Sequence, residues 1–115
     1  MIIDMANKRL IDLVVSSLSF INVAYILRKH YPKELVMDKL DKLMSLCDIS
    51  PIDREVVKKA IRLQARDFED AIQYFSACKS DVDIIITRDA TGFAEFDVLV
   101  QTPTEFLRAC MKNGN

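Results

Sequence analysis

The chain has 115 residues, of which 50% are hydrophobic and 29% are charged, and its net charge is −1. This length is typical of one domain of about 100–150 residues. The balanced charge excludes a bulk electrostatic attraction to nucleic acid or to a membrane surface, and no apolar run approaches the roughly 20 residues that span a bilayer. We therefore expect one soluble domain over residues 1–115, with no membrane partner.

The first residues and the cysteines indicate a cellular compartment. Residues 1–5 contain an early acid and lack the basic stretch that opens a signal peptide. Cys47, Cys78 and Cys110 are widely spaced and odd in number. They suit buried thiols in a reducing compartment better than a disulfide framework or a metal site. The sequence therefore predicts a cytoplasmic protein.

Hydrophobic spacing predicts a helix, a strand and a second helix at the start of the chain. Residues 1–10 carry apolar side chains at roughly helical spacing, and residues 10–15 form a short β-branched run typical of a buried strand. Ser17 or Ser19 is placed to cap a helix that runs to about His30. The dipeptide that follows, Tyr-Pro, ends this helix.

The middle of the chain predicts two helices around a very short strand. A single apolar stripe over about 33–46 indicates a helix, and residues 47–49 are a strand candidate. The next helix is expected to open at residues 50–53, with Ser50 as its cap and Pro51 in its first turn.

The last part of the chain predicts two helices and two strands. A helix begins at Asp67 and reaches about residue 79, with Phe68, Ile72, Phe75 and Cys78 expected in the core. Residues 83–87 and 98–100 are strands, separated by a loop, and three consecutive isoleucines suit a strand that is covered on both faces. A capping box at 102–105 opens a final helix over about 103–112. Short apolar strands between helices predict an α/β fold with a parallel sheet and helices on both faces.

Several kinds of chemistry have no support in this sequence. The chain has one histidine, His30, whose place at a helix end suits the helix dipole. Without a second histidine or a nearby cysteine a zinc site is not expected. Only two glycines are present, so there is no glycine-rich phosphate loop.

Acidic side chains near the ends of the predicted strands are the remaining candidates. Asp89 follows the isoleucine strand, and Asp67, Glu69 and Asp70 lie at the start of the helix before it. Ligands gather at the carboxyl ends of parallel strands, and a hard cation such as Mg²⁺ prefers carboxylates. The alternative is structural: Asp67 as an N-cap, the other two as first-turn acids and Asp89 as a turn residue. Spacing alone favours the structural alternative.

Three segments resemble a known family. They read DFEDAIQYFSA at 67–77, DIIITRD at 83–89 and VQTPTEFL at 100–107. Together they resemble the C-terminal half of a PIN domain, the fold of the toxin in VapBC-type toxin–antitoxin pairs, and residues 16–29 resemble that family's second strand and the helix after it. The resemblance implies a three-layer α/β/α fold with a short parallel sheet. It also implies an Mg²⁺- or Mn²⁺-dependent endoribonuclease that acts on RNA, pairs with an antitoxin and forms a homodimer.

The resemblance assigns roles to particular residues. Asp70 and Asp89 match acids of the family and are the expected catalytic and metal-binding residues. Asn22 stands where many members carry Glu, so it is expected to be a weak metal ligand because an amide has no charge. Thr87 and Arg88 are the expected substrate contacts. Gly92 stands where many members have a further Asp.

The chain also departs from the family pattern. Members open with a strand that ends in an Asp-x-Asn motif, and this strand lies in the middle of the sheet, whereas residue 1 aligns within the second helix. Without that strand, residues 12–16 and 84–87 would lack a common neighbour. We expect that these two strands pair directly, that a second chain fills the gap, or that the chain is part of a longer one.

Two functional hypotheses follow. The first is a relative of the ribonuclease toxins whose own activity is impaired or lost, because two carboxylates hold Mg²⁺ weakly. The alternative is a non-enzymatic module for protein binding or dimerisation that derives from a PIN domain, with the exposed apolar side chains of the first two helices as its surface. Whether the chain is an enzyme stays open at this point.

Overall fold

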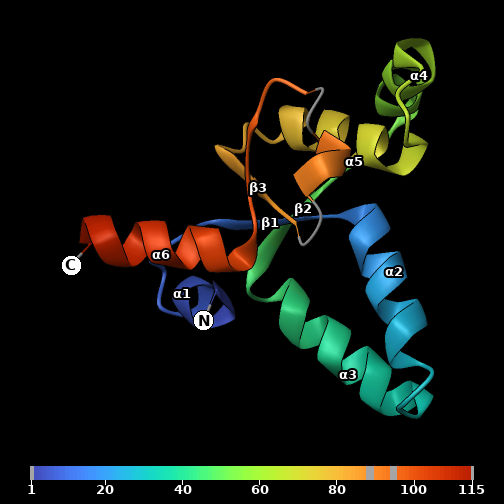
Figure 1. The fold of residues 1–115 in the computed structure, drawn as a ribbon. Coiled ribbons are helices and arrows are strands. Elements are labelled where there is room, and N and C mark those ends of the chain that lie inside the picture. The colour runs from blue at the N-terminus through green and yellow to red at the C-terminus, as the bar shows by residue number, and fades with distance from the viewer. Residues whose placement is uncertain (1, 88–89, 94–95, 115) are drawn as a thin grey trace.

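The computed structural model describes residues 2–87, 90–93 and 96–114. The elements run, in chain order, α1 (Ile2–Asn7), β1 (Leu13–Ser16), α2 (Ser17–Leu27), α3 (Lys33–Met44), β2 (Cys47–Ser50), α4 (Arg54–Leu63), α5 (Phe68–Lys79), β3 (Ile84–Ile86), the 3₁₀ helix η1 (Ala90–Phe93), β4 (Leu99–Gln101) and α6 (Pro103–Gly114). The predicted order of helices and strands is confirmed (Figure 1). The short η1 lies in the segment that was expected to be a loop.

The strands form two separate parallel pairs. β1 pairs with β2, with Leu13 opposite Cys47 and Ser16 opposite Ser50. β3 pairs with β4, with Ile84 opposite Leu99. Within the described part of the chain β1 and β3 do not pair, so the expected single sheet is divided. Direct pairing of these neighbours, one of the three outcomes expected for this place, is therefore not found among the described residues.

The core lies where α4 and α5 pack against each other. Val56, Ala60, Ala71 and Ile72 form a buried cluster, each with at most 5% of its surface exposed. The partly buried side chains that pack against this cluster come from several elements, and they are Leu18, Ile52, Ala65, Phe75 and Phe96. Helix α5 also contacts β1, β2 and η1, so it joins the core to the strands.

Several expectations about burial were wrong. Phe68 is 52% exposed because it occupies the first position of α5, outside the helix contact. Cys78 is exposed, and Cys47 and Cys110 are half-buried, so none of the three free thiols is in the core. The three isoleucines of β3 are half-buried and are not covered on both faces.

Two predicted helix starts were displaced. Ser50 ends β2, and the N-cap of α4 is Asp53, whose Oδ1 accepts from the Val56 N–H at 3.0 Å. Ser16 caps α2 by accepting from the Ser19 N–H at 3.1 Å, one residue before the predicted cap at Ser17. Each helix start has more than one candidate cap within a few residues, because Ser and Asp are both favoured at this position.

Helices α2 and α3 form an open V that projects from the rest of the molecule (Figure 1). The molecule is accordingly extended in two directions, with dimensions of 40 × 37 × 21 Å. In the described part of the chain, no helix has the length and apolar character needed to cross a membrane.

Candidate functional site

The first turn of α5 holds the acid that the sequence placed at the centre of the site. Asp67 caps this helix, because its Oδ1 accepts from the Asp70 N–H at 3.0 Å. This bond holds the backbone of the first turn of α5 at Asp70. The side chain of Asp70 is half-buried. The structural role expected for Asp67 is therefore confirmed, and it also positions Asp70.

Asp70 packs against η1. A β-carbon added to Gly92 would overlap the Asp70 Oδ2 atom and approach its Cγ at 3.1 Å. No larger residue fits at position 92 unless the carboxylate moves. η1 therefore lies against the first turn of α5 at Gly92, where the absence of a β-carbon leaves room for the Asp70 carboxylate.

Asn22 reaches the same turn of α5 from α2. Its Nδ2 donates to Glu69 Oε1 at 3.0 Å, and Asn22 is half-buried while Glu69 is exposed. The amide nitrogen is engaged in this bond, so its Oδ1 is the atom that remains to face a cation. The structure thus brings Asn22 to Glu69, the residue next to Asp70.

A row of hydrogen-bonded polar side chains follows the same face of α5. We call this row the polar seam, and its members are Ser16, Ser19, Gln73, Ser50 and Ser76. Ser16 Oγ donates to Gln73 Oε1 at 2.6 Å, and Gln73 Nε2 donates to Ser19 Oγ at 3.2 Å. Ser16 is only 7% exposed, so these bonds satisfy groups that are largely shielded from water. The seam ties the end of β1 and the start of α2 to α5, and it holds Asn22 beside Glu69.

The buried end of the seam lies under β2. Ser76 Oγ donates to the Pro51 carbonyl at 2.8 Å and lies 2.7 Å from Ser50 Oγ, and both serines are at most 2% exposed. The sequence reasoning missed these residues. A signal was present, because Glu69, Gln73 and Ser76 recur at helical spacing on one face of α5.

The strand end that should complete the site lies only partly in the described chain. Thr87 is half-buried, and its N–H donates to the Gln101 carbonyl at 3.1 Å, which extends the pairing of β3 with β4 by one residue. Arg88 and Asp89 lie outside the described residues. η1 is the next described segment of the chain, and it contacts α5 at Asp70.

The oxygens of this site suit a hard cation in kind. Asp70 offers a carboxylate and Asn22 an amide oxygen, both of which Mg²⁺ or Mn²⁺ accepts. Among the residues that the structure describes, no three His, Cys, Asp or Glu side chains gather closely enough to hold a metal ion. A full set of ligands would therefore require Asp89 beside Asp70.

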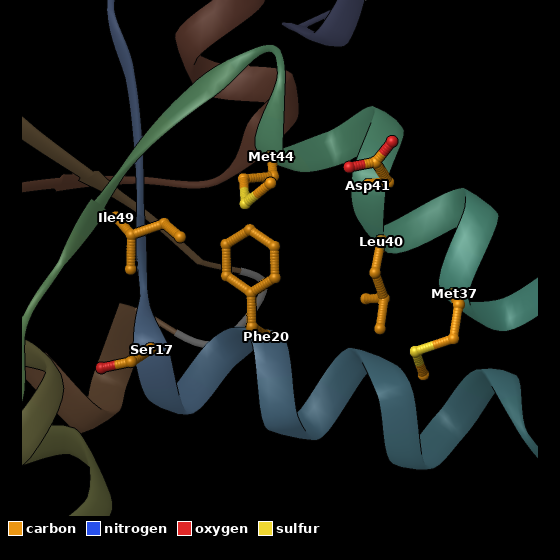
Figure 2. A pocket seen from close by; sticks show the side chains of 7 residues that line it. All are labelled: Ser17, Phe20, Met37, Leu40, Asp41, Met44 and Ile49. Carbon is orange, nitrogen blue, oxygen red and sulfur yellow. The ribbon is translucent and has the colours of Figure 1, made fainter.

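A second feature lies in the V between α2 and α3. A cavity of about 400 Å³ opens there, and Figure 2 shows Phe20 of α2 facing Leu40 and Met44 of α3 across it. Its other lining residues are Ser17, Met37, Asp41 and Ile49. Met37 and Met44 are each 50% exposed, and Ile49 is 45% exposed. The cavity is an apolar groove that is open to solvent. It is separate from the first turn of α5 with its cap, residues 67–70, which we call the acidic turn.

The fold and the acidic turn define a class of protein. Short parallel strands alternate with helices, and an acid in a capped first turn packs against the segment that follows the third strand. The sequence pattern of the PIN domain family matches residues 1–91, and the chain belongs to this family. The matched region includes Asn22, Asp70, Thr87 and Asp89.

One similar protein has a name that states its function. Ribonuclease VapC1 of Aquifex aeolicus (strain VF5) is 32% identical to the chain over 107 residues, which are 89% of this chain and 72% of that protein. The chain is thus related to a VapC-type ribonuclease. No solved structure matches the chain significantly.

Proposed function

We propose that the acidic turn of α5 is the remnant or working part of a divalent-cation-dependent endoribonuclease site, and that residues 1–115 alone cleave RNA weakly or not at all. The contact between Asp70 and η1 is the observation that carries this proposal. It brings η1, which follows Asp89 closely in the sequence, against the turn that holds Asp70, and this supports a metal site shared by carboxylates from different elements. The similarity to Ribonuclease VapC1 supports RNA as the substrate.

The family resemblance supports a role for each of the individual residues. Asp70 and Asp89 would hold Mg²⁺ or Mn²⁺ as the catalytic acids, and Asn22 would add a weak ligand through Oδ1. The ion, when bound, lowers the pKa of a coordinated water and neutralises phosphate charge. Asp67 and the bond from Asn22 to Glu69 orient the turn, while Thr87 and Arg88 would contact the substrate phosphate.

Two features of the chain support weak activity. Asn22 brings no charge where many members of the family carry Glu, and Gly92 brings no carboxylate where many members have a further Asp. Fewer carboxylates mean a weaker hold on a hard cation.

The test is cleavage of a labelled single-stranded RNA by the purified chain with Mg²⁺, with Mn²⁺ and with EDTA. We expect little or no metal-dependent product. Robust cleavage that disappears in Asp70→Ala and Asp89→Ala would overturn the impairment and keep the site. Robust cleavage that both variants retain would overturn the assignment of these residues.

The groove between α2 and α3 favours a second function, that of a dimerisation module without enzymatic activity. We propose a second copy of the chain as its occupant. The exposed face of α3 beside the groove carries Asp38, Lys39, Asp41 and Lys42, so its two signs alternate and the same surface can pair with itself. The free thiols support a cytoplasmic location for such an assembly, because the cytoplasm keeps thiols reduced.

Size-exclusion chromatography with light scattering tests this second function. We expect a dimer, and Phe20→Asp together with Met44→Asp should return it to a monomer with unchanged circular dichroism. A monomer of the parent chain with no co-purifying small protein would count against the binding module. A stable complex with a small partner in place of a dimer would make an antitoxin the occupant.

A further inference from the structure

The turn between α2 and α3, at the point of the V, concentrates positive charge. Residues 25–33 contain Arg28, Lys29 and Lys33 and no acid. Lys39, six residues further along α3, adds a fourth cation, and all four side chains are exposed. Within the described part of the chain none of the four forms a salt bridge, while the neighbouring Asp38 is paired with Lys42 at 3.2 Å. We call residues 25–33 together with Lys39 the hairpin tip.

Two exposed aromatic rings lie among these cations. Tyr25 is 59% exposed and Tyr31 is 41% exposed. Arg28 Cζ lies 5.4 Å and Lys29 Nζ lies 5.5 Å from the centre of the Tyr25 ring, and Lys39 Nζ lies 4.9 Å from the centre of the Tyr31 ring. These cation–π contacts hold charged groups beside ring faces at the surface.

Local helix stability explains only part of this arrangement. The dipole of α2 favours Arg28 and Lys29 near its C-terminus. The same effect disfavours Lys33, which is the first residue of α3 and therefore lies at the positive end of that helix. Nor does a dipole account for two large rings left in water. The arrangement suits a ligand that carries both negative charge and flat apolar faces.

We propose that the hairpin tip binds single-stranded RNA, with phosphates held by the cations and bases stacked on the two tyrosines. Interleaved basic and aromatic side chains are the general means of binding single strands without sequence readout. Along α2, Arg28 is six positions from Asn22, or about 9 Å at about 1.5 Å per residue. A single short RNA could therefore touch both the tip and the acidic turn. The inference rests on the proposed function for RNA as the ligand class.

Fluorescence anisotropy of a short labelled oligouridylate, in EDTA so that no cleavage occurs, tests this inference. The tip variant is Arg28→Gln, Lys29→Gln and Lys33→Gln. The matched control is Arg54→Gln, Lys58→Gln and Arg62→Gln, which removes the same charge from exposed positions of α4. We expect the tip variant alone to reduce the salt slope of log K by about 2, since each phosphate contact to a single strand contributes about 0.7.

A second variant tests the stacking. Tyr25→Leu with Tyr31→Leu keeps apolar bulk but removes the rings, and we expect about tenfold weaker binding with the salt slope retained. Circular dichroism of each variant verifies the fold. Equal binding by the parent, tip and control chains would overturn the inference, and so would a parent that binds no RNA.

Two further results separate this inference from its alternatives. If the tip variant loses binding to phosphatidylserine vesicles but keeps its affinity for RNA, the tip is a membrane site and the inference is wrong. If RNA binding depends on the tip while the parent cleaves RNA robustly and both Asp70→Ala and Asp89→Ala retain that cleavage, the tip stands and the assignment of the nuclease site falls.

Discussion

The two strand pairs differ in how well the rest of the chain supports them. β1–β2 lies against α5 through the polar seam, with Ser16, Ser50 and Ser76 each at most 7% exposed and hydrogen-bonded. β3–β4 has half-buried isoleucines on one strand and Leu99, at 56% exposed, on the other. Gln101 Oε1 in β4 is buried, and it has no hydrogen-bond partner among the residues that the structure describes.

This difference bears directly on function. Asn22 and Asp70 belong to the well-supported side, whereas Thr87 follows β3 on the other side. The contact between Gly92 and Asp70 is where the two sides meet at the candidate site. How firmly the site is assembled therefore depends on how firmly the second strand pair is held.

The sharpest test of this difference compares one change in two places. Ile72→Ala removes a side chain that is 5% exposed in the α4–α5 core, so we expect a loss of about 2–5 kcal/mol in the free energy of unfolding. Ile85→Ala makes the same change in the half-buried β3, and we expect a loss of about 1 kcal/mol. Urea denaturation followed by circular dichroism measures both. Equal losses would show that β3 is as well packed in solution as the core.

The polar seam should contribute less than the apolar core but a measurable amount. Ser76→Ala leaves the Pro51 carbonyl and the Ser50 hydroxyl without their buried partner, and we expect a loss of about 1–3 kcal/mol. Ser45→Ala is the control, because Ser45 is exposed and its hydroxyl donates to the carbonyl of Lys42 in the helix before it. A similar loss in both variants, again by urea denaturation, would show that the seam adds no particular support to β1–β2.

Local signals in the sequence were sufficient for the order of elements. Asp67 caps α5 as expected, and Thr102 and Glu105 form the predicted reciprocal capping box, with bonds of 3.2 and 2.8 Å. These features depend on residues three apart. Burial depends on partners far along the chain, so Phe68 and Cys78 were assigned to the core although both are exposed.

The candidate site was predictable only in part, for the same reason. Asp70 could be placed in a helix turn, and the family resemblance named it. Its contact with Gly92 and the bond from Asn22 to Glu69 join residues 22 and 47 positions apart, which no local pattern encodes. The seam showed its period in Glu69, Gln73 and Ser76, but its partners on β1, α2 and β2 could come only from the fold.

Gly92→Ala tests the place where the two sides meet. The added β-carbon would displace the Asp70 carboxylate, which is the movable end of a side chain, so the free energy of unfolding should change by less than about 1 kcal/mol. The effect should appear instead at the site. Paramagnetic broadening of amide signals by Mn²⁺ should weaken around residue 70 as much as it does in Asp70→Asn. Unchanged broadening in Gly92→Ala would separate Gly92 from the metal-binding function.

The smallest expected effect lies at the start of α4, away from the site. The Lys79 ammonium donates to Asp53 Oδ2 at 2.6 Å and, with the Val56 N–H, holds the pKa of the Asp53 carboxyl below its ordinary value. A lowered pKa in the folded state means that the contribution is present above the ordinary Asp value of about 3.9 and is lost as pH falls below it. Lys79 has its pKa raised by the same bond, so its part is lost only in strong alkali.

Asp53→Asn isolates this ion pair, because Asn is also a good N-cap and keeps the bond to Val56 available. The parent chain should therefore lose more stability than the variant between about pH 5 and pH 2, and the two should differ little in slope near neutral pH. Thermal unfolding across this range measures the difference. The gap should shrink in high salt, because both partners are open to solvent and exposed ion pairs are screened. If both chains lose stability in parallel on acidification, other carboxylates govern the acid response. The carboxylates of the acidic turn of α5 are then the next to substitute.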